Sequence, residues 1–207
     1  MTIEGLDFSG KSTLVRLLRE ELSETPALGQ TVFTREPGGT PAAERIREVL
    51  LDPGLEVDVW TEAYLYAAAR ADHVRNGLRP ALAEHAVVVC ERYLDSSLAY
   101  QGAGRGLGIE TVRRLNEWAV DGLVPGRSFY LALDATERER RARESGASLD
   151  RVERAGAGFM RRAEECFEEL VREEPGRVVR LDATRPPGEL AKAVLREVRD
   201  LLYTHPG

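Results

Sequence analysis

Short apolar runs alternate along the chain with longer segments in which apolar residues recur every three or four positions. Short runs rich in valine, phenylalanine and leucine favour β-strands, whereas the longer spacing favours helices with one buried face. Strands are predicted at residues 2–4, 31–34, 87–91, 129–133 and 178–181. Helices are predicted at residues 11–22, 41–51, 59–76, 79–85, 109–121, 137–144, 157–173 and 188–202. This alternation predicts an α/β fold, in which a doubly wound parallel sheet carries helices on both faces.

Length and composition favour one domain. The 207 residues are 43% hydrophobic, which suffices for a sizeable core, and no Ser/Gly/Pro-rich linker divides them. We therefore expect a single domain over residues 1–207. No apolar run approaches about 20 residues and no cationic lead precedes one, so neither export nor membrane insertion is indicated and we expect a cytoplasmic protein. The first predicted strand is unusually short, because a glycine-rich loop begins at Gly5.

The charge balance narrows the class of partner. A net charge of -6 argues against a general nucleic-acid-binding surface, which depends on clustered positive charge. It does not argue against a small anionic ligand, because the arginines within a cleft decide such binding. Cys90 and Cys166 lie in an apolar and a helical run, and we expect both to be reduced thiols.

Residues 5–12 read G-L-D-F-S-G-K-S, which is the G-x-x-x-x-G-K-[ST] pattern of a phosphate-binding loop. Gly5 and Gly10 permit sharp turns, so backbone N–H groups can converge on phosphate oxygens at the start of the next helix. We expect Lys11 to reach the terminal phosphates and Ser12 to offer its hydroxyl to Mg²⁺. Lys11 is one of only two lysines among 29 lysines and arginines, which favours a functional role for it.

Sheets of this type bind ligands at the carboxyl ends of their strands. Two predicted strand ends carry an arginine, Arg35 within T-R-E-P-G-G-T and Arg92 within E-R-Y. The guanidinium group presents a fork of donors that suits a phosphate dianion. The sequence therefore predicts that a second anion binds opposite the phosphate loop.

Four segments of the sequence resemble those of one protein family. They read T-R-E-P-G-G-T at 34–40, Y-A-A-A-R at 66–70, E-R-Y-L-D-S-S-L-A-Y-Q-G-A-G-R-G-L at 91–107 and L-D-R-V-E at 149–153. With the phosphate loop, the chain resembles the thymidylate kinases, which phosphorylate dTMP to dTDP with ATP and Mg²⁺. The resemblance implies a P-loop NTPase-type fold with a five-stranded sheet and a short lid at roughly residues 141–154. It also implies ATP and dTMP as partners and a homodimeric assembly.

On the donor side, the resemblance implies that ATP binds at Gly5, Asp7, Phe8, Ser9, Gly10, Lys11, Ser12 and Thr13. The implied metal-binding residues are Ser12 and Glu91. The family usually has aspartate where Glu91 stands, and the longer side chain leaves open whether Glu91 contacts the ion directly.

The resemblance also implies that a lid arginine contacts the donor phosphates. Some family members carry an arginine in the phosphate loop, but Phe8 occupies that position here. The lid must then supply the cation, from Arg141, Arg143 or Arg151. Arg151 is preferred because it lies in the L-D-R-V-E motif.

For the acceptor phosphate and sugar, the resemblance implies contacts from both sides of the crevice. Arg35 and Arg92 match arginines that hold the phosphate, and Pro37 matches a proline after a cis peptide bond. Tyr100 matches a ring that crowds a ribose 2′-hydroxyl. Asp7 matches a carboxylate that contacts the 3′-hydroxyl.

For the base, Tyr66 falls where the family stacks an aromatic ring on thymine, and Arg70 matches a residue that contacts the base. Ser97 and Gln101 match positions that hydrogen-bond the pyrimidine edge. The residues predicted to carry the chemistry are Lys11, Arg92, Arg151, Asp7 and Glu91.

Two alternatives share these features. One is another nucleoside or nucleoside monophosphate kinase of the same fold. The other is a homologue that binds nucleotides without turnover, which the short first strand, Phe8 and Glu91 suggest. A GTPase switch is disfavoured, because the chain has no N-K-x-D motif for reading guanine.

Overall fold

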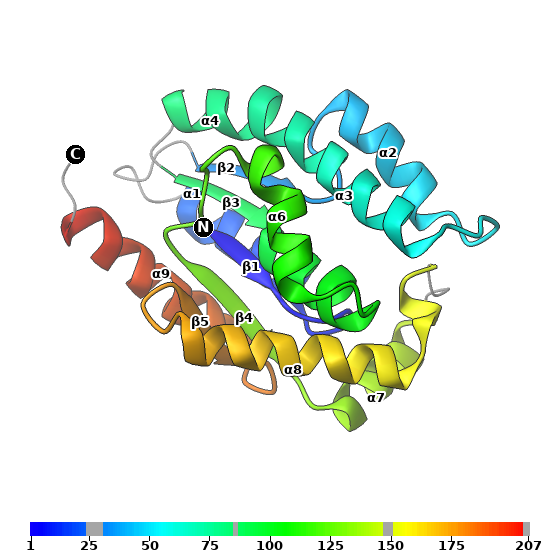
Figure 1. Cartoon of the computed structure of the whole chain (residues 1–207). Helices are drawn as coiled ribbons and strands as arrows, with labels where there is room; N and C mark the ends of the chain where they lie inside the picture. Colours follow the sequence, from blue (N-terminus) through cyan, green and yellow to red (C-terminus); the bar gives the residue numbers. More distant parts are fainter. Residues whose placement is uncertain (24–30, 85–86, 147–150, 205–207) are drawn as a thin grey trace.

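Five parallel strands form one sheet in the order β2-β3-β1-β4-β5 (Figure 1). The computed structural model describes residues 1–23, 31–84, 87–146 and 151–204. The strands are β1 (Thr2–Glu4), β2 (Thr31–Arg35), β3 (Val87–Glu91), β4 (Ser128–Ala132) and β5 (Val178–Asp182). All five predicted strands are confirmed to within one residue at each end.

The register brings the strand ends that carry chemistry to one edge of the sheet. Ile3 on β1 pairs with Glu91 on β3, and Glu91 in turn pairs with Arg35 on β2. The strands that follow β1 in sequence lie on both sides of it, with β3 on one side and β4 on the other. Crevices for ligands form at such a switch in strand order. The phosphate loop after β1 therefore opens beside the ends of β2 and β3.

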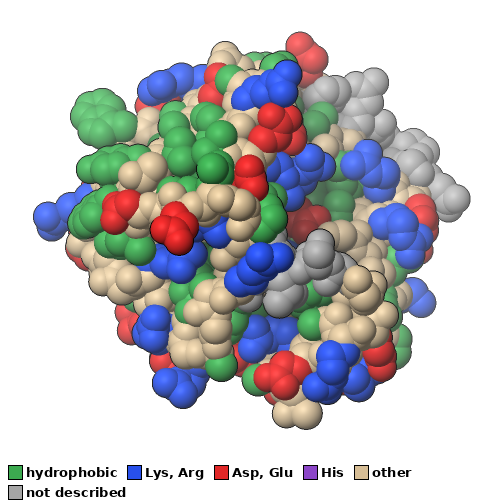
Figure 2. Space-filling view, turned by 90° about the vertical axis from the view of Figure 1, so that its right-hand side faces the viewer, with side chains coloured by type: hydrophobic (Ala, Val, Ile, Leu, Met, Phe, Trp, Pro, Cys, Tyr) green, Lys and Arg blue, Asp and Glu red, His purple; other side chains and the backbone are tan. Residues whose placement is uncertain are grey.

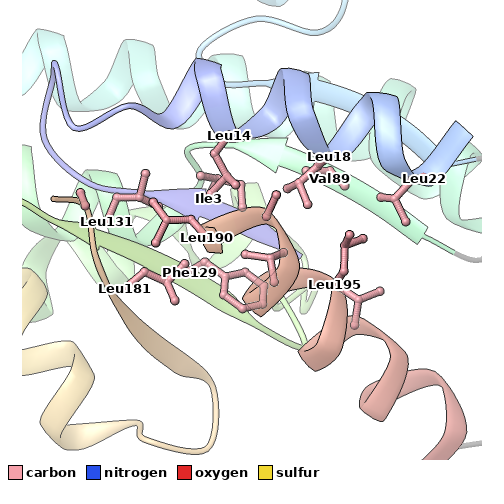
Figure 3. Close-up of a cluster of buried hydrophobic side chains, with 14 of the residues drawn as sticks. Ile3, Leu14, Leu18, Leu22, Val89, Phe129, Leu131, Leu181, Leu190 and Leu195 are labelled. Carbon is pink, nitrogen blue, oxygen red and sulfur yellow. The ribbon is translucent and has the colours of Figure 1, made fainter. Parts of the chain in front are cut away.

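Helices α1 (Lys11–Ser23) and α9 (Pro187–Thr204) cover one face of the sheet. The two helices place leucines against buried strand residues such as Ile3 and Phe129 (Figure 3). The period of three to four in both helices produces this apolar stripe, which is why they were predictable from the sequence. The buried core fixes the start of α1, and with it the phosphate loop.

The opposite face is covered by α6 (Ile109–Val120), α8 (Ala157–Glu173) and the segment from α3 (Val59–His73) through the π-helical turn Val74–Leu78 into α4 (Arg79–Glu84). The ring of Tyr130 stacks on Phe167 of α8 with centroids 4.8 Å apart. Helix α2 (Pro41–Leu51) packs on α3, and α7 (Ala135–Ser145) begins after β4. Thus the predicted α/β sheet with helices on both faces is confirmed.

The predicted helices 59–76 and 79–85 are in fact one continuous helical run, and His85 lies outside the described residues. A second difference is larger, because no helix was predicted at α5 (Leu94–Ser97) and the π-helical segment η3 (Leu98–Gly104). Serine and glycine give this stretch weak helix propensity, but it is buried against α6 and α8. Tertiary packing outweighs propensity there.

None of the helices in the described part of the chain combines the length and apolar content that crossing a membrane requires.

Candidate active site

A cavity of about 550 Å³ opens at the carboxyl edge of the sheet. Figure 2 looks onto this side of the molecule and shows Lys and Arg side chains around a hollow. Its lining includes these predicted site residues: Asp7, Phe8, Gly10, Lys11, Ser12, Thr13, Arg35, Pro37, Tyr66, Arg70, Glu91, Arg92, Ser97, Tyr100, Gln101 and Arg141. Residues from the phosphate loop and from four distant segments thus share one cavity.

The phosphate loop has the backbone that its glycines permit. Gly5 has φ +135°, and a Cβ built there would lie 2.8 Å from the carbonyl oxygen of Leu131. A side chain at this position would clash with β4, so only glycine lets the loop turn this close to the sheet. Phe8 adopts φ +63°, and Ser9 is buried beneath the loop.

Lys11 lies at the start of α1 with only 5% of its surface exposed. Its Nζ donates a 2.7 Å hydrogen bond to the Leu6 carbonyl and lies 3.9 Å from the Asp7 carboxylate. Burial, and after it the charge of Arg92, lower the pKa of Lys11 to about 8. A phosphate anion beside this ammonium would counter both effects.

Ser12 and Glu91 meet at the edge of the loop. The Ser12 hydroxyl donates a 3.0 Å hydrogen bond to Oε1 of Glu91, which ends β3. The sequence predicted these two residues as the metal-binding pair, and the structure places their oxygens side by side. Hydroxyl and carboxylate oxygens are the hard ligands that Mg²⁺ prefers, so this donor set fits the ion.

Arg92 reaches back under the phosphate loop from a left-handed backbone conformation, φ +66°. It donates to the Gly5 carbonyl at 2.9 Å and pairs with the Asp7 carboxylate. Tyr100 donates a 3.1 Å hydrogen bond to the other oxygen of Asp7. Burial would raise the pKa of Asp7, but the charges of Arg92 and Lys11 outweigh burial and lower it. Asp7 is therefore ionised at neutral pH.

The Arg35 side chain, which is 53% exposed, pairs with Glu44 at 3.1 Å on the cavity wall. The peptide bond between Glu36 and Pro37 is cis, as the resemblance implied. Sequence reasoning missed Arg47, which lines the same wall and donates to the Pro37 carbonyl at 2.9 Å. No motif distinguishes Arg47, because it stands among other charged residues in the middle of α2.

The residues predicted to face the base come together on the far wall. Arg70 is 2% exposed and donates to Glu36 at 2.8 Å, to Ser97 at 3.0 Å and to the Tyr93 carbonyl at 3.0 Å. Tyr66 is half-buried and lines the cavity one helical turn before Arg70. These contacts hold the guanidinium of Arg70 rigidly in the wall.

The three lid arginines have different surroundings. Arg141 donates to the Ser9 carbonyl at 3.4 Å and to the Ala183 carbonyl at 2.8 Å, so it lies beside the phosphate loop. Arg143 is exposed and does not line the cavity. Arg151 instead pairs with Glu62 at 2.6 Å.

The structure thus places Arg141, and not the preferred Arg151, at the phosphate loop. The reason is electrostatic: Arg151 neutralises the buried carboxylate of Glu62 on α3. Residues 147–150, which include the first two residues of the L-D-R-V-E motif, lie outside the described residues. The assignment of Arg151 to the donor phosphates remains a prediction.

Comparison with known proteins gives a consistent result. A family model described as "Thymidylate kinase" matches residues 3–194. A thymidylate kinase of Symbiobacterium thermophilum is 46% identical over 203 residues, covering 98% of this chain and 93% of that protein. One of Deinococcus radiodurans is 44% identical over 201 residues, covering 97% and 96%. A crystal structure of thymidylate kinase from Ehrlichia chaffeensis matches with a TM-score of 0.75 and 29% identity, covering 94% of this chain and 96% of that one. The chain belongs to the thymidylate kinase family.

Proposed function

We propose that the protein transfers the terminal phosphoryl group of ATP to dTMP, giving dTDP and ADP. One observation carries the proposal: a single cavity joins a phosphate loop with its lysine to a wall that holds Arg35, Arg47 and Arg92. A triphosphate donor and a second anion can therefore meet within it. Membership of the thymidylate kinase family identifies the acceptor as dTMP.

On the donor side, the loop amides and Lys11 would bind the phosphates at the N-terminus of α1. Ser12 and Glu91 would hold Mg²⁺, which supplies charge neutralisation on the transferring group when bound. Arg141 extends from α7 to the Ser9 carbonyl, so it is the described lid arginine placed to add a further positive charge.

On the acceptor side, Arg35, Arg47 and Arg92 would hold the monophosphate close to the donor against the repulsion of two anions. The attacking phosphate oxygen carries no proton at neutral pH, so it requires no strong base. Asp7, which bridges Arg92 and Tyr100, would contact the sugar through its carboxylate. Catalysis then rests on positioning and charge.

An acceptor panel tests this proposal. The purified protein is incubated with ATP, Mg²⁺ and each of dTMP, dUMP, CMP and thymidine, and product nucleotides are quantified. We expect dTMP to give the highest kcat/KM. A strong preference for another acceptor would favour a different kinase of the same fold, and binding without any product would favour a non-catalytic homologue.

We further infer a homodimer in the cytoplasm. Helices α3 and α6 pack together and expose large aromatic side chains: Trp60 (42%), Tyr64 (59%) and Trp118 (83%). A second copy would cover such a surface. Cys90 and Cys166 are both free and buried, which suits a reducing compartment. Sedimentation velocity tests the assembly, and a monomer at micromolar concentration would contradict it.

A further inference from the structure

Glu62, in the first turn of α3, is a buried acid that the proposed transfer does not use. The residue is 0% exposed, and its carboxylate accepts hydrogen bonds from three side chains. Gln101 of η3 donates to Oε1 at 2.9 Å, Arg105 donates to both oxygens at 3.1 and 2.9 Å, and Arg151 donates to Oε2 at 2.6 Å. Glu62 thus ties the base wall of the cavity to the lid.

The negative charge of Glu62 determines how the Gln101 amide is oriented. Burial would raise its pKa, but the hydrogen bonds from Arg105, Gln101 and Arg151 outweigh burial and lower the pKa. An ionised carboxylate only accepts hydrogen bonds. Gln101 must therefore turn its amide nitrogen toward Glu62, and a flipped amide would set two oxygens against each other.

This orientation decides what the base wall offers a ligand. Because an N–H of Nε2 is held by Glu62, the carbonyl oxygen of the Gln101 amide is turned away from Glu62, and Gln101 lines the cavity. Ser97 accepts from Arg70, so its own hydroxyl hydrogen remains to donate. The wall therefore combines an acceptor from Gln101 with a donor from Ser97.

Pyrimidine bases differ in which of positions N3 and C4 carries the hydrogen-bond donor and which the acceptor. A 4-oxopyrimidine such as thymine or uracil presents an N3–H donor beside a carbonyl acceptor at C4. A 4-aminopyrimidine such as cytosine presents the reverse, an N3 acceptor beside an amino donor. A Gln amide that could flip would suit either base at N3, whereas a fixed one suits only the first.

We propose that Glu62 is a specificity-positioning residue, which holds the Gln101 amide in one orientation and so makes the site select 4-oxopyrimidine over 4-aminopyrimidine monophosphates. The inference rests on the proposed function, because it requires the acceptor base to bind beside Gln101.

The test compares dTMP with dCMP as acceptors, using purified full-length protein, ATP and Mg²⁺. In Glu62→Gln, residue 62 can donate as well as accept, so the Gln101 amide is free to flip. We expect the ratio of kcat/KM for dTMP to that for dCMP to fall about tenfold or more, with dCMP use rising in absolute value. The change should appear mainly in KM for each acceptor, because it concerns binding of the base.

The matched control is Arg105→Gln, which removes an ion pair from the same carboxylate but keeps the bond between Gln101 and Glu62. We expect this variant to keep the wild-type ratio, even if overall activity falls. A ratio that is unchanged in Glu62→Gln, or shifted equally in Arg105→Gln, would overturn the inference.

Should Glu62→Gln fail to fold, Glu62→Asp serves as the second variant. It keeps the negative charge for both arginines but withdraws the acceptor from Gln101 by one methylene. We expect a lowered ratio here too, and an unchanged one would overturn the inference. Absence of dTMP turnover in the unaltered protein would overturn the proposed function itself, whereas dTMP turnover with unshifted ratios would overturn this inference alone.

Discussion

The hydroxyl of Ser12 and the carboxylate of Glu91, 79 residues apart in sequence, share a 3.0 Å hydrogen bond at the mouth of the phosphate loop. This contact joins the start of α1 to the end of β3. It gathers two hard oxygen ligands where the donor phosphates would lie.

We expect Glu91→Gln to raise the Mg²⁺ concentration needed for half-maximal rate by roughly 10- to 100-fold, because the amide loses the charge that attracts the ion. Initial rates over a Mg²⁺ titration measure this effect. Glu117→Gln, an exposed change on α6, serves as the control and should leave the titration unaltered. An unshifted midpoint in Glu91→Gln would argue against its role at the metal.

The lowered pKa of Lys11 predicts that kcat/KM for ATP depends on pH. Its pKa is about 8 in the folded protein and 10.5 ordinarily, so the ammonium loses its charge at lower pH than an exposed lysine. We expect kcat/KM for ATP, which reports the free enzyme, to fall above about pH 8. At saturating ATP the fall should move to higher pH, because bound phosphate stabilises the ammonium. A kcat/KM that stays flat to pH 9.5 would contradict this.

The same shift affects stability with a defined sign. Between pH 8 and 10.5 the unfolded chain binds more protons at Lys11 than the folded one does. The contribution of Lys11 to the free energy of unfolding therefore rises with pH across that window. Urea unfolding of Lys11→Met against the wild type at pH 7 and pH 10 measures this contribution. We expect the variant to gain stability relative to wild type at pH 7 and to lose most of that gain at pH 10.

Arg92→Ala should lower kcat/KM for dTMP by about 10²-fold or more, because it removes a fixed donor for the acceptor phosphate. It also leaves the Asp7 carboxylate without its guanidinium partner. Steady-state kinetics with each substrate varied in turn separate the two sides of the site. A loss confined to the apparent affinity for ATP would contradict the assignment of Arg92 to the acceptor.

The lid arginines offer a direct contrast. Arg141 contacts the Ser9 carbonyl, so Arg141→Ala should reduce kcat by about 10³-fold if it neutralises the transferring group. Arg151 pairs with Glu62, so Arg151→Ala should lose much less in kcat. A larger loss in kcat for Arg151→Ala than for Arg141→Ala would instead support the sequence-based preference for Arg151.

Much of this site follows from sequence, because its parts lie at strand ends. The strand pattern places Arg35, Glu91 and Arg92 at one edge of a parallel sheet, and the loop motif places Lys11 and Ser12 beside them. Any chain with this alternation brings such residues together.

Other parts could not be predicted, because they depend on packing between distant segments. Arg47 lines the cavity only because α2 packs on α3, and a mid-helix arginine carries no signal of its own. Glu62 of α3 gathers Gln101 and Arg105 from one distant segment and Arg151 from another. The position of Arg151 follows from that buried charge, which its motif does not reveal.

The most direct test of the account is a crystal structure with dTMP and a non-hydrolysable ATP analogue bound together. We predict the triphosphate on residues 5–13 with Lys11 at its terminal phosphates, and the monophosphate of dTMP between Arg35 and Arg92. A dTMP pocket left empty at saturating ligand, or a triphosphate bound away from the phosphate loop, would contradict it.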